Sequence, residues 1–124
     1  MHKGMDAVMW TSLVDPSAPS RREADGDWRR FRELRTQARQ QFAEETLAQA
    51  LELSLDDDLD VQQRELALEA LMIRRARERR GLFEDYNRDH LPLMLTTMLN
   101  QGLVQRDELM DLSLELKRAL GLLD

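Results

Sequence analysis

Apolar residues recur at intervals of three and four positions along most of the chain, the spacing that places side chains on one face of an α-helix. Between Asp27 and Gly81 the sequence contains neither glycine nor proline, so nothing in it interrupts a long helix. Asp27 is a suitable N-cap, and we predict a helix over residues 28–54, about 40 Å long at 1.5 Å per residue. Two apolar stripes, slightly rotated from each other, follow it: Trp28, Phe31, Leu34, Ala38 and Phe42, and then Leu47, Ala50, Leu51 and Leu55.

A second helix is predicted over residues 59–80, with its charges sorted along the axis. Four aspartates lie at its start, between residues 56 and 60, and five arginines lie in its last two turns. This arrangement complements the helix dipole, and Gly81 follows as a left-handed stop. The middle of the segment, residues 66–73, is apolar nearly all round. That composition predicts a helix surrounded by other helices rather than one on a surface.

Two shorter helices are predicted toward the C-terminus. The first covers residues 91–101, with Pro92 in its first turn and Gly102 at its end. The second covers residues 106–120 and stops at Gly121. Its apolar stripe consists of Leu109, Leu112, Leu116 and Leu120. No strand pattern of useful length appears, so the sequence predicts an all-α fold, a compact four- to five-helix bundle.

The first 26 residues differ from the rest and predict an amphipathic arm on a tether. Pro16 and Pro19 end any helix before them, and Asp25-Gly26-Asp27 interrupts the capping signal that begins at Ser20. We therefore expect an arm and flexible linker over residues 1–26 and a single helical domain over residues 27–124. The apolar side of the arm is formed by Met5, Val8, Met9, Trp10 and Leu13.

Composition narrows the class of protein. A chain of 124 residues is one domain by the length prior, and it is long enough to bury a core without a disulfide or metal. Cysteine is absent, which excludes disulfides, thiolate metal sites and cysteine nucleophiles. No stretch approaches the roughly 20 apolar residues of a membrane span, and no signal peptide is evident. A cytoplasmic location without membrane contact is the expectation.

The residues that carry chemistry in enzymes are few. The two histidines, His2 and His90, stand apart from any metal-binding or catalytic motif. The acidic run from Asp56 lacks the glycine and glutamate that a calcium loop requires at its sixth and twelfth positions, where Val61 and Ala67 stand. No glycine-rich phosphate loop or nucleophile elbow is present. The sequence therefore predicts a protein that is not an enzyme and carries no cofactor or metal.

Arginine clusters supply an alternative function. Residues 41–70 carry one arginine and nine acids, a net charge of −8, whereas the segments on either side are basic. If the first two long helices are antiparallel, both arginine clusters come to the same end of the bundle and could take a nucleic-acid backbone. Dipole compensation and local ion pairs explain the same residues without a function. The candidate patch comprises Arg29, Arg30, Arg32, Arg35, Arg74, Arg75, Arg77, Arg79 and Arg80.

The main functional hypothesis is a non-enzymatic protein–protein interaction module, such as an adaptor, an assembly chaperone, or an inhibitor or regulator of a larger complex. It would bind through an apolar helical groove or through the N-terminal arm, with complementary charge setting specificity. Three interpretations of the arm stay open: it folds back on its own domain, crosses to a second copy in a homodimer, or binds a foreign partner. Nucleic acid as the partner remains the alternative.

Overall fold

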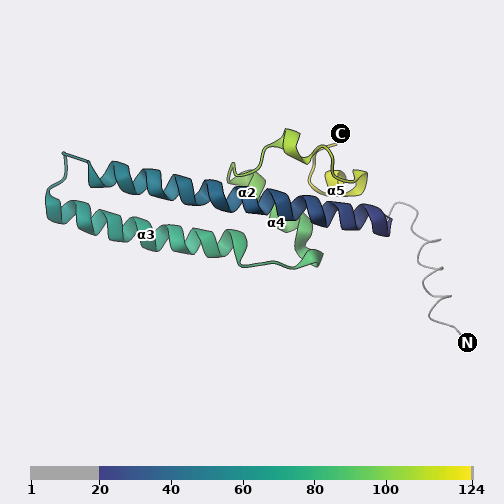
Figure 1. Cartoon of the computed structure of the whole chain (residues 1–124), viewed down its shortest axis with the longest axis horizontal. Coiled ribbons are helices and arrows are strands. Elements are labelled where there is room, and N and C mark those ends of the chain that lie inside the picture. Colours follow the sequence, from purple (N-terminus) through teal and green to yellow (C-terminus); the bar gives the residue numbers. More distant parts are fainter. Residues whose placement is uncertain (1–19, 124) are drawn as a thin grey trace, which may run out of the picture.

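The computed structural model describes residues 20–123, and within them it confirms the all-α prediction. Four α-helices follow one another as α2 (Arg21–Ser54), α3 (Val61–Phe83), α4 (Leu91–Asn100) and α5 (Leu114–Ala119). Two short 3-10 helices, η1 (Arg88–His90) and η2 (Arg106–Leu109), precede α4 and α5. Helices α2 and α3 form a long antiparallel hairpin, and the C-terminal elements gather against one part of it (Figure 1).

Helix α2 begins earlier than the sequence pattern predicted. Ser20 is its N-cap: the Ser20 hydroxyl accepts a hydrogen bond from the Glu23 N–H, and the Glu23 carboxylate accepts one from the Ser20 N–H, each at 3.0 Å. This capping box offsets the cost of Gly26, so residues 21–26, expected to belong to the linker, form the first turns of α2. Asp27 as N-cap is therefore wrong; it lies inside the helix and is 6% exposed.

Helix α3 begins close to the predicted place but runs past its predicted stop. Asp60 is its N-cap and forms a capping box with Gln63. Gly81 does not end the helix; α3 continues to Phe83, and only Gly102 and Gly121 adopt positive φ among the described residues. The reason lies in the next two residues, because Leu82 and Phe83 are buried in the core and hold the last turn helical.

The C-terminal part confirms one predicted helix and corrects another. Helix α4 matches the prediction within one residue, and Gly102 ends it with φ +72°, its N–H bonded to the Leu99 carbonyl. The single helix expected over residues 106–120 is wrong: η2 and α5 are separate, with a turn between them. Leu109, Leu112 and Leu116 of the predicted stripe are nevertheless buried, so the apolar pattern marks burial here rather than continuous helix.

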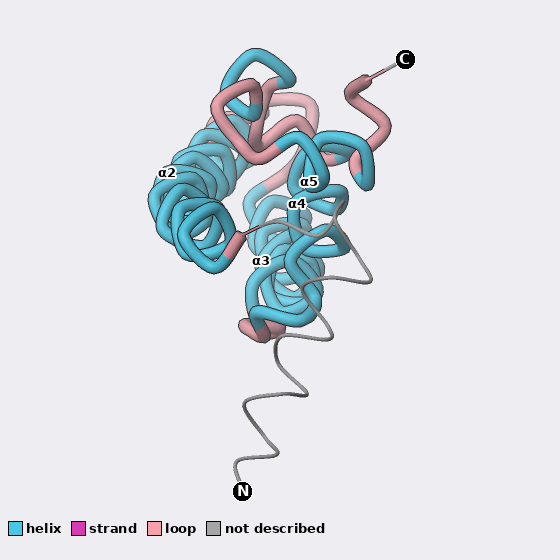
Figure 2. The backbone as a smooth tube through the Cα atoms, turned by 90° about the vertical axis from the view of Figure 1, so that its right-hand side faces the viewer, coloured by secondary structure: helices cyan, strands magenta, loops and turns pink. Residues whose placement is uncertain are grey.

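The hydrophobic core lies at one end of the hairpin. It contains the first half of α2, the last turn of α3, and α4, η2 and α5. Seen from the N-terminal end of α2, the C-terminal elements lie beside α2 (Figure 2), and they cover only part of the length of the hairpin (Figure 1). The largest side chains that are almost completely buried are Phe31, Leu34, Leu95, Met98, Leu109 and Val104.

The other half of the hairpin projects away from this core (Figure 1). Between residues 47 and 74 the only side chain in the buried class is Leu71. The prediction that the apolar middle of α3 is surrounded by other helices is therefore wrong. The approximately 40 residues after Phe83 form short elements that cover the first half of α2, and none of them extends to the turn between α2 and α3.

Arg75 joins the two helices where the core ends. It is 8% exposed; its Nε donates to the Thr46 hydroxyl at 2.8 Å and its Nη2 to the Phe42 carbonyl at 3.0 Å. Its guanidinium carbon lies 3.7 Å from the centre of the Phe42 ring, and the carboxylates of Glu45 and Glu78 lie 3.6 and 3.4 Å away. Charge, hydrogen bonds and ring contact together fix the register of α3 on α2.

Replacing Arg75 with methionine should destabilise the protein by about 1–3 kcal/mol, because the Thr46 hydroxyl and the Phe42 carbonyl lose a charged donor. Urea unfolding followed by circular dichroism measures the effect. Arg77→Met is the matched control: Arg77 lies half a turn away and is exposed, so its loss should change stability by less than about 0.5 kcal/mol. Equal effects of the two changes would contradict the assigned role of Arg75.

An ion pair between Asp25 and Arg88, 2.5 Å apart, ties the start of α2 to η1. The hydrogen bond from Arg88 lowers the pKa of Asp25 below its ordinary value. A carboxyl whose folded pKa is depressed adds stability above its unfolded pKa and loses that contribution as pH falls through the folded pKa. Asp25→Asn should therefore lower the thermal midpoint slightly at pH 7, and the difference from wild type should shrink as the pH falls below the ordinary aspartate pKa of 3.8 and through the lowered pKa of Asp25. A difference that persists unchanged into acid would contradict this assignment.

Candidate functional site

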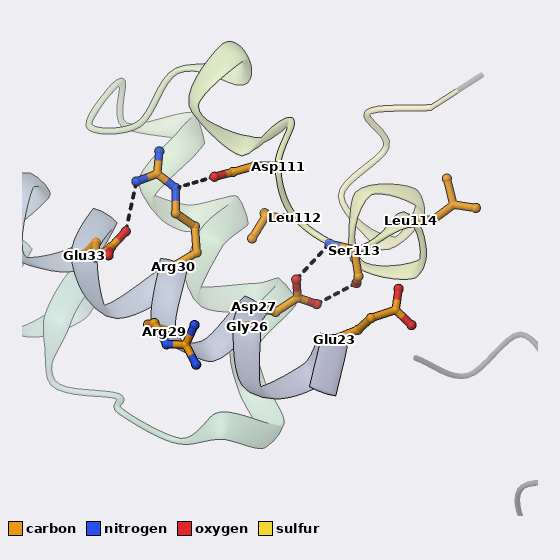
Figure 3. Close-up of a pocket in the computed structure, with 10 residues that line it drawn as sticks. All are labelled: Glu23, Gly26, Asp27, Arg29, Arg30, Glu33, Asp111, Leu112, Ser113 and Leu114. Carbon is orange, nitrogen blue, oxygen red and sulfur yellow. Dashed lines mark hydrogen bonds and ion pairs between the residues drawn. The ribbon is translucent and has the colours of Figure 1, made fainter. Parts of the chain in front are cut away.

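A polar hollow of about 500 Å³ lies between the start of α2 and the segment that leads into α5 (Figure 3). Asp27 is at its base, and its two carboxylate oxygens accept hydrogen bonds from the backbone N–H and the hydroxyl of Ser113, at 2.8 and 2.5 Å. Ser113 is the N-cap of α5 and also accepts a bond from the Leu116 N–H. Asp27 thus anchors the start of α5 to α2, which is a structural role.

Arg30 occupies the other side of this hollow (Figure 3). Its guanidinium lies 3.2 Å from a carboxylate oxygen of Glu33 and 3.4 Å from one of Asp111, and it donates to the Glu108 carbonyl at 3.1 Å. The charges of Asp27 and Arg30 are therefore paired by internal contacts. We assign the hollow to holding the C-terminal segment against α2.

The projecting half of the hairpin has the opposite character, because it exposes large apolar side chains. Seven of them are between 43% and 74% exposed: Leu47, Leu51, Leu55, Val61, Leu66, Met72 and Ile73. Isolated exposed apolar residues are ordinary, but a group of this size within 27 consecutive residues is not. This surface is the candidate functional site.

Three of these residues lie on one side of the hairpin, which we call the hairpin face: Leu47, Val61 and Met72. Leu47 and Met72 line the same groove between the helices, and Val61 lies eleven residues, or three turns, before Met72 on α3. Leu51 and Leu55 follow Leu47 at four-residue intervals, and each lies about 40° farther around α2, away from α3. The Thr46–Arg75 bond sets the antiparallel register, so Leu47 and Leu51 lie on either side of the level of Met72.

A groove of about 550 Å³ crosses the hairpin face between the two helices. Ala43, Leu47 and Met72 line it, and Arg39 and Arg79 stand at the end nearest the core. The groove on the opposite side of the hairpin, about 530 Å³, is lined by more polar and charged side chains, namely Gln49, Glu52, Asp56 and Arg74. An apolar partner surface therefore fits the first groove better than the second.

Leu66 and Ile73 are exposed on another side. Ile73 follows Leu71 by two positions, about 200° around the helix, and Leu71 is buried against α2. Leu66 and Ile73, seven residues apart, therefore lie on the outer side of α3, away from α2. They extend the apolar surface of the hairpin around α3.

Charge is distributed unevenly along the hairpin. Its tip, the turn between α2 and α3, carries Asp57, Asp58 and Asp60, and the core end of the groove carries Arg39 and Arg79. Within residues 20–123 none of these five side chains makes an ion pair. The hairpin face thus has an apolar centre, a negative end and a positive end.

The predicted arginine clusters come together only in part. The arginine-rich end of α3 lies beside the middle of α2, so Arg39 and Arg79 share a groove. Arg29 and Arg30 lie beyond the end of α3, near the C-terminal segment (Figure 3). Arg32, Arg74, Arg77, Arg79 and Arg80 are exposed.

Arg30, Arg35 and Arg75 of the predicted patch make internal contacts. Arg35 donates to the Phe83 carbonyl at 2.7 Å, and its guanidinium carbon lies 4.6 Å from the centre of the Tyr86 ring. Burial lowers the pKa of Arg35 from its ordinary value. The contacts of these three residues stabilise the fold. The remaining arginines lie on different sides of their helices, so they do not form one surface.

The predicted arm residues Met5, Val8, Met9, Trp10 and Leu13 lie outside the described residues. In the part of the chain that the structure describes, no group of three or more acidic, histidine or cysteine side chains is placed to hold a metal ion. No helix in that part is both long and apolar enough to cross a membrane.

Sequence reasoning missed the hairpin face although its signal was present. The stripe through Leu47, Leu51 and Leu55 is evident in the sequence, but the pattern alone does not show whether another element covers it. In the structure the elements between Phe83 and Leu123 pack on the first half of α2, and within residues 20–123 only α3 packs on the second half.

Comparison of the chain with models of known protein families, with curated proteins and with solved structures finds no match. The function therefore has to be argued from the geometry of the hairpin and its charges.

Asp27→Ala should release the start of α5, because the Ser113 N–H and hydroxyl lose a charged acceptor. The expected loss of stability is about 1–3 kcal/mol. Amide hydrogen exchange should become faster across residues 113–119 and stay unchanged in the hairpin. Glu33→Ala removes an exposed ion pair from the same hollow and should cost less than about 1 kcal/mol. Unchanged exchange in α5 after Asp27→Ala would contradict the anchoring role.

Proposed function

We propose that this chain is a non-enzymatic protein–protein interaction module that binds its partner through the hairpin face. The single observation that carries the proposal is the group of three large apolar side chains, Leu47, Val61 and Met72, 43% to 74% exposed, on one side of a projecting helix pair. Adaptor, assembly chaperone, and inhibitor or regulator of a larger complex are the roles that such a module takes.

Energetic magnitudes support a binding role for this surface. Covering an exposed leucine or methionine stabilises a complex by roughly 25 cal/mol for each Å² removed from water. Leu47 and Met72 of the hairpin face line one groove, so a single partner surface covers them together. Arg39 and Arg79 border that groove and supply the charged rim that sets specificity and association rate.

The polar side chains outside the hairpin face also support the proposal, because their contacts stabilise the fold. Asp27, Ser113 and Arg30 have internal partners that hold α5 and the C-terminal segment. His90 and Asp85 form an exposed pair, 2.9 Å apart, next to η1 and remote from the hairpin face. The groups that most resemble catalytic pairs are therefore explained by local structure.

The nucleic-acid alternative has less support. Three of its nine arginines, Arg30, Arg35 and Arg75, make contacts inside the protein. The net charge is −6, and the aspartates of the tip lie on the same hairpin as the exposed arginines. Binding to a phosphate backbone depends on concentrated positive charge, which this distribution does not provide.

The test compares two double variants of the full chain as bait in nuclease-treated extract of the cells that produce it. Leu47→Ser with Met72→Ser makes the hairpin face polar. Leu93→Ser with Leu114→Ser is the matched control, because these residues are 63% and 51% exposed but lie on α4 and α5. Quantitative mass spectrometry identifies the captured protein, and calorimetry with the purified partner measures affinity. The hairpin variant should bind at least tenfold more weakly, and the control should bind as wild type does.

Both variants change exposed positions, so their unfolding midpoints should stay close to that of wild type. Equal affinity of wild type and the hairpin variant for the captured partner would contradict the proposal. So would loss of binding in the control variant alone, since it would place the binding surface on α4 and α5.

A further inference from the structure

We propose that the partner of the hairpin face is the same face of a second copy, with the two hairpins antiparallel. The acidic tip of each copy then lies beside Arg39 and Arg79 of the other. This inference rests on the proposed function, because it identifies the partner that covers the hairpin face. It uses four observations: the charges at the two ends of the face, their spacing, the position of the apolar residues between them, and the free space around the projecting half.

The charges of the hairpin face complement each other when one copy is reversed. Asp57, Asp58 and Asp60 are at the tip, Arg39 and Arg79 are at the core end, and none of them has an ion-pair partner within residues 20–123. A two-fold axis through the middle of the face brings each acidic end to a basic end, twice in each dimer. A parallel arrangement would instead bring acids to acids and arginines to arginines.

The apolar residues lie where such an axis requires them. Residues 60 and 79 bound the face along α3, and the midpoint between them falls near residue 70, close to Met72. The register set by Thr46 and Arg75 places Leu47 within about one turn of that level on α2. Leu47 and Met72, which line the same groove, therefore form the centre of the interface, and the charges form its ends. An apolar centre with a charged rim is the usual anatomy of a stable interface.

The size of the face suits a dimer of this kind. Nineteen residues of α3 between positions 60 and 79 span about 28 Å, and two helices side by side are about 20 Å wide. That footprint is of the same order as the ~800 Å² that each partner contributes to a standard interface. Two hairpins packed in this way make a four-helix bundle with leucine and methionine inside.

Nothing in the described part of the fold obstructs this arrangement. The C-terminal elements lie against the first half of α2, far from the tip (Figure 1). In an antiparallel dimer the two cores lie at opposite ends of the bundle, and only the projecting halves overlap. Leu66 and Ile73, on the outer side of α3, remain outside the contact and available to another protein.

A charge exchange between two variants tests the pairing directly. One variant of the full chain carries Arg39→Glu with Arg79→Glu, and the other carries Asp57→Arg with Asp58→Arg. Wild type should be a dimer at tens of micromolar by light scattering after size-exclusion chromatography. Each variant alone places like charges together at both ends, so its dimer dissociation constant should rise at least tenfold. Mixed one to one, the variants restore both opposite-charge contacts and should form a mixed dimer with nearly the wild-type constant.

Two controls make each outcome decisive. Circular dichroism and the unfolding midpoint establish that both variants are folded, as expected for exposed positions. Arg29→Glu with Arg32→Glu makes the same change of charge on α2 outside the hairpin face and should leave the dimer intact. Leu47→Ser with Met72→Ser should abolish the dimer through loss of its apolar centre.

A wild-type chain that stays monomeric up to about 100 μM would overturn the inference. A dimer that neither charge variant weakens, or two weakened variants that do not restore each other, would overturn the antiparallel pairing. These failures are distinguishable from failure of the proposed function. A monomer that still loses a foreign partner through Leu47→Ser with Met72→Ser would leave the interaction module standing with another occupant on its face.

Discussion

The contact of Arg75 with Thr46 and Phe42 fixes how α3 packs on α2, and therefore which side chains of the hairpin are exposed. A buried guanidinium is costly to desolvate, and it is tolerated here because it has a hydroxyl, a carbonyl, an aromatic ring and two carboxylates around it. Satisfying all these groups at once admits one register of α3 on α2. That register decides which residues of α3 lie level with Leu47 and Leu51, and so it determines the composition of the hairpin face.

The second constraint is the unequal length of the two parts of the chain. Helix α2 has 34 residues, but the C-terminal elements that pack on it are short and end at Leu123 in the described range. The core therefore stabilises one half of α2, and the other half depends on α3 alone. Two helices bury only one stripe of each other, so a pair without further neighbours must leave apolar positions exposed. The exposed leucines follow from this shortage of covering chain.

Local signals allowed much of the fold to be predicted from the sequence. The Asp60 N-cap region, the glycines at 102 and 121 and the buried stripe of Leu109, Leu112 and Leu116 depend on a few neighbouring residues. The errors arose where a distant residue decides. Ser113 starts a new helix because Asp27, 86 positions earlier, holds its N–H. Gly81 stays helical because Leu82 and Phe83 enter the core. The hairpin face was missed for the same reason, since a stripe of leucines does not show which surface is there to cover it.

The core and the proposed binding surface lie in different halves of the molecule. The core half pairs its polar groups internally, as in the contacts of Asp27 with Ser113 and of Arg30 with Asp111. The projecting half exposes its leucines, and within residues 20–123 its tip aspartates make no ion pair. Exposed apolar residues alone would favour indiscriminate association. Opposite charges at the two ends of the hairpin face restrict that association, because a partner must present an apolar centre between complementary charges in the reverse order. A second copy of this hairpin meets that requirement through its own symmetry.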